Sequence, residues 1–141
     1  MDTIKFASIE HISDIVKQLP TDTNWSTGAD GTSGAVDPIA YIILEDLYDM
    51  LGHRADVSSI KLFNNVTDPL AYEWHADTSN PTETKITSTV LVYLPNCQKT
   101  AIEFRDHTYY VKPYDVIILG GNVEHRAVGE FHGPVLKYTF L

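Results

Sequence analysis

Apolar residues recur at helical spacing close to the N-terminus of the chain. A first helix is predicted over residues 9–19, because Ser8 precedes this pattern as a cap and Pro20 ends it. The segment that follows, residues 21–37, is rich in Thr, Ser, Asp and Gly and predicts a long loop. A loop of this length either covers a functional site or is an ordinary surface connection, and the sequence favours neither interpretation.

A second helix is predicted to begin at the pair Asp37-Pro38. Asp is favoured as a helix cap and Pro in the first helical position, so both residues suit the start of a helix. The apolar residues that follow form one stripe, and Gly52 stands where a glycine commonly ends a helix. Residues 1–56 are therefore expected to be a helical support with a Gly-rich loop.

From Val57 onward the chain consists of short runs rich in β-branched and aromatic residues, separated by Gly, Pro and Asn turn signals. Two helices followed by many short strands predict an α+β, mainly β domain with the helices against one sheet. A double-stranded β-helix, the two-sheet jelly roll of cupin-like proteins, is an economical arrangement of so many short strands. One domain is expected over residues 1–141, with the jelly-roll core in residues 57–141. The predicted strands are 57–66, 85–94, 101–104, 108–112, 116–119, 125–128 and 134–141.

Composition and charge narrow the class of partner. No apolar run is long enough to span a bilayer, and the N-terminus lacks the basic and apolar pattern of a secretory signal. The net charge of −9, with Lys and Arg spread along the chain, disfavours duplex nucleic acid as a partner. Cys97 is the only cysteine, which excludes an internal disulfide and fits a reducing cytoplasm, the location we expect. The sequence leaves the oligomeric state open.

The triplet His75-Ala76-Asp77 is the first candidate for chemistry. In an extended segment, residues two apart point to the same side, so one imidazole and one carboxylate converge. Together with a distant histidine they would form the two-histidine, one-carboxylate triad that holds Fe(II) and leaves coordination positions open. His125 opens a predicted strand after a Gly-Gly turn and is the favoured third ligand. His107 and His132 are the rivals, and both are expected to be exposed.

The last predicted strand carries a second signal. Its two faces both bear bulky residues, so the strand is expected to be buried on both sides, with Lys137 pointing into the barrel. A buried ammonium needs an anionic partner, and Thr139 on the same face adds a hydroxyl donor, so the pair suits a carboxylate. On the strand 85–94, Tyr93 shares the face that could line the cavity. The alternatives are that Lys137 only prevents edge pairing and that Tyr93 is a packed core residue.

These residues together resemble the Fe(II)- and 2-oxoglutarate-dependent dioxygenases, in particular the compact prolyl-4-hydroxylase-like branch. The similarity covers the C-terminal part of the chain from about residue 57. Many members have Arg where this chain has Lys137, which offers a point charge in place of a bidentate fork. The matching segments are 72–77, 89–96, 111–116, 125–128 and 137–139.

The resemblance implies a role for each matching residue. His75, Asp77 and His125 would bind Fe(II), and Lys137 would pair with the distal carboxylate of 2-oxoglutarate. Thr139 and Tyr93 would help Lys137 to hold the cosubstrate.

The implied reaction consumes O2 and 2-oxoglutarate, releases succinate and CO2, and hydroxylates a C–H bond. The resemblance suggests a prolyl residue of a peptide or protein, or a free amino acid or other small molecule, as the substrate. The rival from another class is a non-catalytic, cupin-like module that binds a metal or a small acid. Demethylation of nucleic acid is a third alternative, which the charge disfavours.

Overall fold

The computed structural model describes residues 4–8, 38–52, 54, 56–63, 65–66, 68–79, 86–94, 97 and 100–141. The predicted helix over residues 9–19 and the predicted loop over residues 21–37 lie outside this part. The described strands are β1 (Ile4–Ser8), β2 (Val57–Phe63), β3 (Ser88–Tyr93), β4 (Ala101–Phe104), β5 (Thr108–Tyr110), β6 (Asp115–Gly120), β7 (His125–Val128) and β8 (Val135–Phe140). The described helices are the α-helix α2 (Pro38–Leu51) and the 3-10 turns η1 (Pro69–Tyr72) and η2 (Asp77–Ser79).

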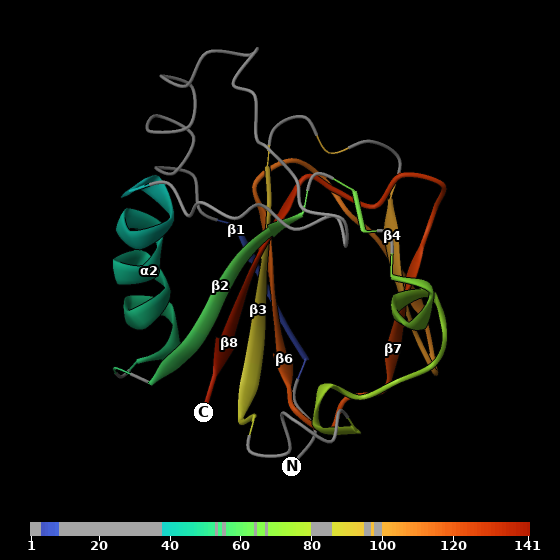
Figure 1. Ribbon diagram of the computed structural model, residues 1–141, viewed down its shortest axis with the longest axis horizontal. Helices are drawn as coiled ribbons and strands as arrows, with labels where there is room; N and C mark the ends of the chain where they lie inside the picture. The colour runs from blue at the N-terminus through green and yellow to red at the C-terminus, as the bar shows by residue number, and fades with distance from the viewer. Residues whose placement is uncertain are drawn as a thin grey trace.

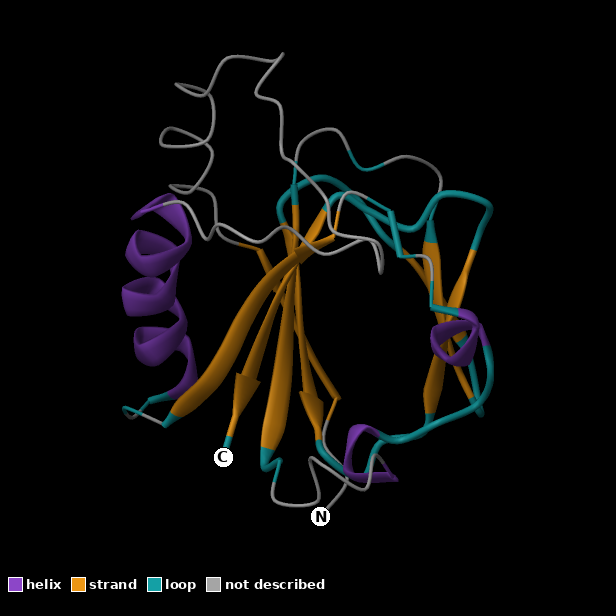
Figure 2. Cartoon of the chain, in the orientation of Figure 1, coloured by secondary structure: helices purple, strands orange, loops and turns teal. Residues whose placement is uncertain are grey.

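The described part of the chain forms three layers. Helix α2 covers one face of a five-stranded sheet, and a three-stranded sheet lies beyond the opposite face (Figure 1). The order in the large sheet is β1-β6-β3-β8-β2 and in the small sheet β5-β4-β7, and all neighbouring strands are antiparallel. The expectation of a mainly β protein with helix against one sheet is confirmed in these residues (Figure 2).

The start and end of helix α2 follow from its sequence. Pro38 is its first residue, as predicted, because the fixed φ of proline suits the first turn and no intrahelical amide is lost there. Gly52 follows the last residue with φ 78°, a left-handed conformation that favours glycine, and its amide donates to the Tyr48 carbonyl at 3.0 Å. No helix in the described residues is long and apolar enough to cross a membrane.

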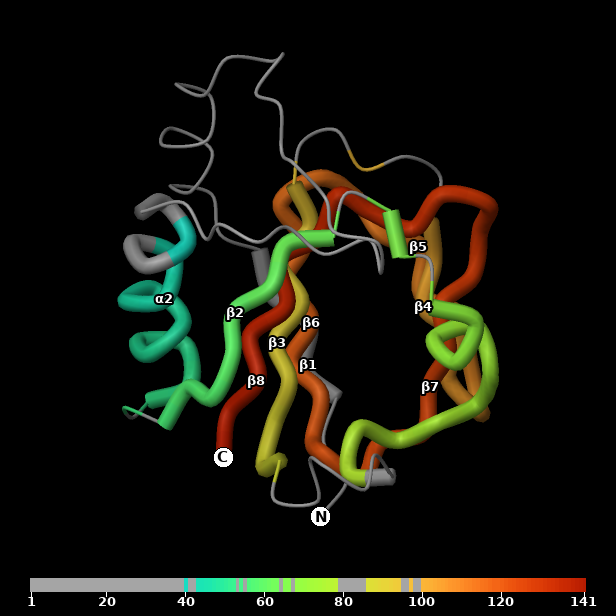
Figure 3. Tube along the Cα trace, in the orientation of Figure 1, coloured from blue at the N-terminus to red at the C-terminus, as the bar shows by residue number. Residues whose placement is uncertain are grey.

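Period-two alternation divides the large sheet into two apolar faces. Val90 and Val92 of β3 pack with Ile43 and Leu47 of α2 in one core. The other face turns toward the small sheet, where Tyr93 and its neighbours form a second core. Strand β8 is buried along most of its length, as the sequence predicts, because it lies in the middle of the large sheet between β3 and β2 (Figure 3).

All seven predicted strands are present, and most of them have different ends. Strands β4 and β7 have the predicted bounds, whereas β2 ends at Phe63 and β3 begins at Ser88. Strand β1 was not predicted, and Ser8, interpreted as a helix cap, is its last residue. The alternation in such a short segment is weak, and β1 is defined by its pairing with β6, which no local pattern contains.

A hydrogen bond between Tyr138 and Ala40 gives a test of the helix–sheet contact. The buried Tyr138 hydroxyl donates to the Ala40 carbonyl at 2.6 Å, joining β8 to α2. We expect Tyr138→Phe to lower the free energy of unfolding by about 1–2 kcal/mol, because a buried hydrogen bond is lost without a change of shape. Urea unfolding measures this change. Tyr110→Phe is the control, since Tyr110 is 75% exposed and should change stability by less than about 0.5 kcal/mol. Equal effects for the two variants would contradict the contact.

Candidate metal centre

Two chain segments that are distant in sequence meet at His75 and His125. The amide of His75 donates to the carbonyl of His125 at 3.1 Å, and the amide of His125 donates to the carbonyl of His75 at 2.9 Å. This reciprocal pair extends the edge of the small sheet beyond β7 by one isolated antiparallel bridge. The two side chains consequently stand next to each other, with ring centroids 4.4 Å apart.

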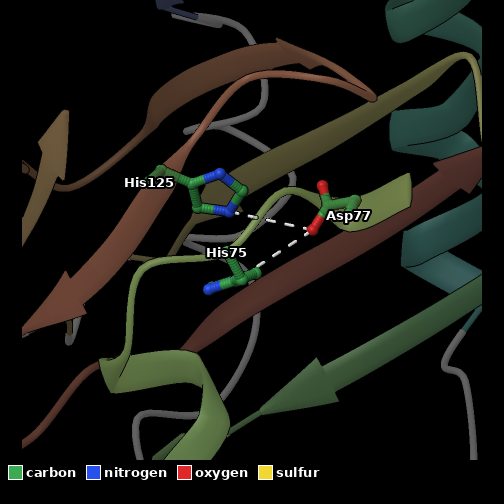
Figure 4. Close-up of side chains that lie close together, drawn as sticks. All are labelled: His75, Asp77 and His125. Atoms are coloured by element: carbon green, nitrogen blue, oxygen red, sulfur yellow. Dashed lines mark ion pairs between the residues drawn. The ribbon is translucent and has the colours of Figure 1, made fainter. Parts of the chain in front are cut away.

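The structure places the Asp77 carboxylate opposite both imidazoles. Its Oδ1 lies 4.0 Å from Nε2 of His75 and 3.7 Å from Nε2 of His125 (Figure 4). One donor atom from each of the three residues lies within 4.8 Å of the others, so the group could hold a metal ion. Metal–ligand bonds of about 2.1 Å at right angles place neighbouring donors about 3 Å apart, so a small contraction of this group would suffice.

The ring nitrogens of both histidines are assigned by their backbone partners. Nδ1 of His75 lies 2.8 Å from the Glu73 carbonyl, and Nδ1 of His125 lies 2.8 Å from the Val123 carbonyl. A carbonyl oxygen only accepts hydrogen bonds, so each Nδ1 carries a proton, and Nε2 is the nitrogen left to bind a metal when the ring is neutral. Burial lowers the pKa of His125, although the Asp77 charge partly opposes this shift, so the ring is neutral, as a metal ligand must be.

Asp77 is a buried carboxylate with an incomplete set of partners. Within the described residues, its Oδ2 has no hydrogen-bond partner. Burying an unpaired carboxylate is costly, and two neutral imidazoles do not neutralise its charge. A bound cation would supply the missing partner, and this donor set, two imidazoles and one carboxylate, suits a first-row metal such as Fe(II).

A cavity of about 440 Å³ adjoins the three side chains, a volume in the range of small-molecule sites. Apolar residues from both sheets form most of its wall. Lys137 on β8 also lines it, as the sequence predicts, and its ammonium has no hydrogen-bond or ion-pair partner in the described residues. Thr89 on β3 lines the same cavity and its buried Oγ1 likewise has no described partner.

The other predicted site residues take different positions. Thr139 is buried and stands directly across from Thr89 in the pairing of β8 with β3, but it is not part of the cavity wall. Tyr93 is fully buried, lies outside the wall, and its hydroxyl is 2.7 Å from Nε2 of His132. His107 is exposed, as predicted, and forms an ion pair with its neighbour Asp106.

The expectation that His132 is exposed is wrong. Its side chain is 4% exposed, lines the cavity and contacts both Tyr93 and Thr100. The sequence places it in a polar turn between two glycines, Gly129 and Gly133, which is typical of a surface hairpin. Both glycines have positive φ, and the turn between them folds back onto the sheet, a tertiary contact that no local pattern predicts.

Sequence reasoning also missed a support on the outer face of the small sheet. The Trp74 ring is contacted by the guanidinium of Arg105 at 4.1 Å and by that of Arg126 at 4.9 Å. Glu124 binds Arg105 at 2.7 Å and Glu103 binds Arg126 at 2.8 Å. Cation–π contacts of this kind stabilise by about 0.5–1 kcal/mol each at exposed sites. They hold the residue that immediately precedes His75.

No protein-family model, curated protein or solved structure matches the chain.

Gly121 offers a test of how Asp77 is held. The Thr78 amide donates to the Gly121 carbonyl at 3.1 Å, and a Cβ at Gly121 would lie 2.3 Å from the Ile86 carbonyl oxygen and 2.7 Å from Cγ2 of Thr78. We expect Gly121→Ala to displace the segment that carries Asp77, to lower stability by about 1–3 kcal/mol and to weaken Fe(II) binding about 10- to 100-fold. Anaerobic calorimetric titration with Fe(II) measures the affinity.

Gly52→Ala is the matched control for this variant. A Cβ at Gly52 meets no atom within 4 Å, but the positive φ is strained for alanine, so stability should fall by about 1 kcal/mol. Fe(II) affinity should stay unchanged, because Gly52 lies at the end of α2. Native affinity in folded Gly121→Ala would contradict the positioning of Asp77 by this contact.

The buried imidazole of His132 predicts a pH dependence of stability. Burial lowers the pKa of His132 to about 4, whereas the group titrates near 6.5 in an unfolded chain. Between these values the unfolded state binds a proton that the folded state excludes, so stability falls as the pH falls from about 6.5 to about 4. The contribution of this group is roughly 3 kcal/mol across the window.

Urea unfolding of the native chain and of His132→Gln at several pH values measures this term. The other titrating groups, including His125, are common to both proteins, so the difference in slope isolates His132. We expect a shallower loss of stability in His132→Gln. Parallel curves for the two proteins would show that His132 is not buried in its neutral form.

Proposed function

We propose that the chain is a double-stranded β-helix oxygenase that uses Fe(II), 2-oxoglutarate and O2 to hydroxylate a C–H bond. The observation that carries the proposal is the pairing of two features in one cavity: the donor set His75, Asp77 and His125, and the unpartnered ammonium of Lys137. A site for a metal alone does not require a half-buried cation beside it. A cosubstrate that binds the metal at one end and carries a carboxylate at the other requires both.

The strand order supports the jelly-roll part of the proposal. Four neighbouring strands of the large sheet have the order β2-β8-β3-β6. The small sheet has the order β7-β4-β5. The bridge at His75 adds a fourth, minimal member beside β7. Along the chain, successive segments alternate between the two sheets, except at the hairpin β4–β5, both of whose strands lie in the small sheet. The large sheet receives β2, β3, β6 and β8, and the small sheet receives the His75 bridge, β4, β5 and β7. An alternation of strands between two antiparallel sheets is expected of a jelly roll, the fold that we propose.

Each residue of the site would have a distinct role. His75, Asp77 and His125 would hold Fe(II) by one face, since their donors converge from one side. Lys137 would pair with the distal carboxylate of 2-oxoglutarate, with Thr139 next to it on the same face of β8 and Tyr93 on the neighbouring strand. Bound Fe(II) would supply the activation of O2, coupled to decarboxylation of 2-oxoglutarate to succinate and CO2 and to hydroxylation of the substrate.

The apolar walls would exclude water from the reacting atoms. The substrate would enter beside η1, where Leu70 lines the cavity and is 65% exposed. A prolyl residue of a peptide or a free amino acid is the substrate class that we propose.

Anaerobic titration with Fe(II) and 2-oxoglutarate tests the proposal. We expect a weak visible charge-transfer band in the native chain and none in His75→Ala. Lys137→Ala should raise the Kd for 2-oxoglutarate about 10- to 100-fold, because a charge-assisted hydrogen bond is lost. Lys112→Ala is the charge-matched control, because Lys112 is exposed and lies outside the cavity. The Kd of this variant for 2-oxoglutarate should equal that of the native chain.

Admission of O2 then separates the two classes of function. An oxygenase forms succinate, slowly even without substrate, whereas a cupin-like binding module binds the metal or the acid and forms none. The absence of the band in the native chain would refute the proposed site, and binding without succinate would establish the binding module in its place.

A further inference from the structure

Three buried polar side chains form a continuous row beside the cavity, and one of them, His132, belongs to its wall. The hydroxyl of Tyr93 lies 2.7 Å from Nε2 of His132, and the hydroxyl of Thr100 lies 2.5 Å from Nδ1 of the same ring. The Thr100 hydroxyl also donates to the Val128 carbonyl at 3.4 Å. Tyr93 comes from β3 in the large sheet, Thr100 directly precedes β4 in the small sheet, and His132 lies in the turn between β7 and β8. The row therefore joins the two sheets beside the proposed cosubstrate site.

The partners of His132 determine which of its nitrogens carries the proton. The Thr100 hydroxyl has one proton, which it donates to the Val128 carbonyl, so its oxygen has only a lone pair for Nδ1 of His132. Nδ1 is therefore the donor to Thr100, while Nε2 faces Tyr93. Burial keeps the ring neutral by lowering the pKa of His132 to about 4, so Nε2 has only a lone pair.

This assignment leaves one direction for the hydrogen bond at Tyr93. Nε2 of His132 has no proton to give, so the phenol donates to it. Burial, together with the nearby Cys97 and Asp115, raises the pKa of Tyr93 well above its ordinary value, so the phenol keeps its single proton. The hydroxyl then has only lone pairs to offer elsewhere, and lone pairs repel a carboxylate.

We propose that His132 is a positioning residue that retains the hydroxyl proton of Tyr93, so that Thr89 and not Tyr93 donates beside Lys137 to the bound acid. The inference rests on the proposed function and revises the role that the resemblance gives to Tyr93. Thr89 suits this role because its Oγ1 is buried, lines the cavity and has no partner in the described residues. Its backbone neighbour across the strand pair is Thr139, two residues from Lys137 on the same face of β8.

The Kd of 2-oxoglutarate, measured anaerobically in the Fe(II)-loaded protein, shows whether Tyr93 donates to the bound acid or to His132. We expect Thr89→Val to raise the Kd roughly three- to tenfold, because one neutral hydrogen bond is lost, and Tyr93→Phe to change it less than about twofold. In His132→Leu the phenol proton is released, so adding Tyr93→Phe to that variant should now weaken binding. A tenfold weakening by Tyr93→Phe in the native background, or no effect of Thr89→Val, would overturn the inference.

A measurement on the native chain makes the test independent of the stability of these variants. With ¹⁵N-labelled histidine and Zn(II) as a diamagnetic metal, long-range ¹H–¹⁵N spectra report which nitrogen of His132 is protonated. We expect protonated Nδ1 and unprotonated Nε2, unchanged by 2-oxoglutarate, and protonated Nε2 in either state would overturn the inference. If native protein binds no 2-oxoglutarate while Nδ1 is protonated, the proposed function fails and the inferred direction of the Tyr93 hydrogen bond stands.

Discussion

The candidate site depends on one pair of reciprocal backbone hydrogen bonds, between His75 and His125. This pair attaches an otherwise irregular segment to the edge of β7 and fixes two imidazoles side by side. Each ring is then oriented by the carbonyl two residues before it, from Glu73 or Val123. Asp77 follows His75 by two residues, at the start of η2, and its carboxylate lies opposite both rings. Loss of the pair would therefore separate all three donors at once.

The outer face of the small sheet supports this arrangement from behind. Trp74 lies against two arginines, one of them Arg126 next to His125 in sequence. Each arginine is bound to a glutamate, so its position is defined by charge as well as by the ring. Trp74 directly precedes His75, and Arg126 directly follows His125. Their contact therefore couples the two ligand-bearing segments a second time, independently of the backbone pair.

Local sequence patterns predict the parts of this structure that local physics determines. Pro38 and Gly52 define the ends of α2 through their own φ preferences. Alternation predicts that Lys137 lines the cavity, whereas Tyr93 and Thr139, predicted on the same faces, lie outside its wall. The H-x-D spacing likewise predicts a shared direction for two side chains. Neither the partners of β1 nor the burial of His132 follows from neighbouring residues, because both arise from contacts with distant segments. A polar residue in a Gly-rich turn, such as His132, is expected to be exposed unless the turn packs back onto the sheet.

The number of protein donors bears on the choice between catalysis and storage of a metal. Structural metal sites commonly close around the ion with four protein ligands, whereas catalytic sites keep positions for exogenous groups. Within the described residues the donor group contains His75, Asp77 and His125 and no fourth His, Cys, Asp or Glu. The positions that remain would face the cavity, which carries a free ammonium at Lys137 and a free hydroxyl at Thr89. Unpartnered polar groups weaken an empty site and strengthen an occupied one, so their presence beside an open metal centre would suit a ligand that binds both the metal and these groups.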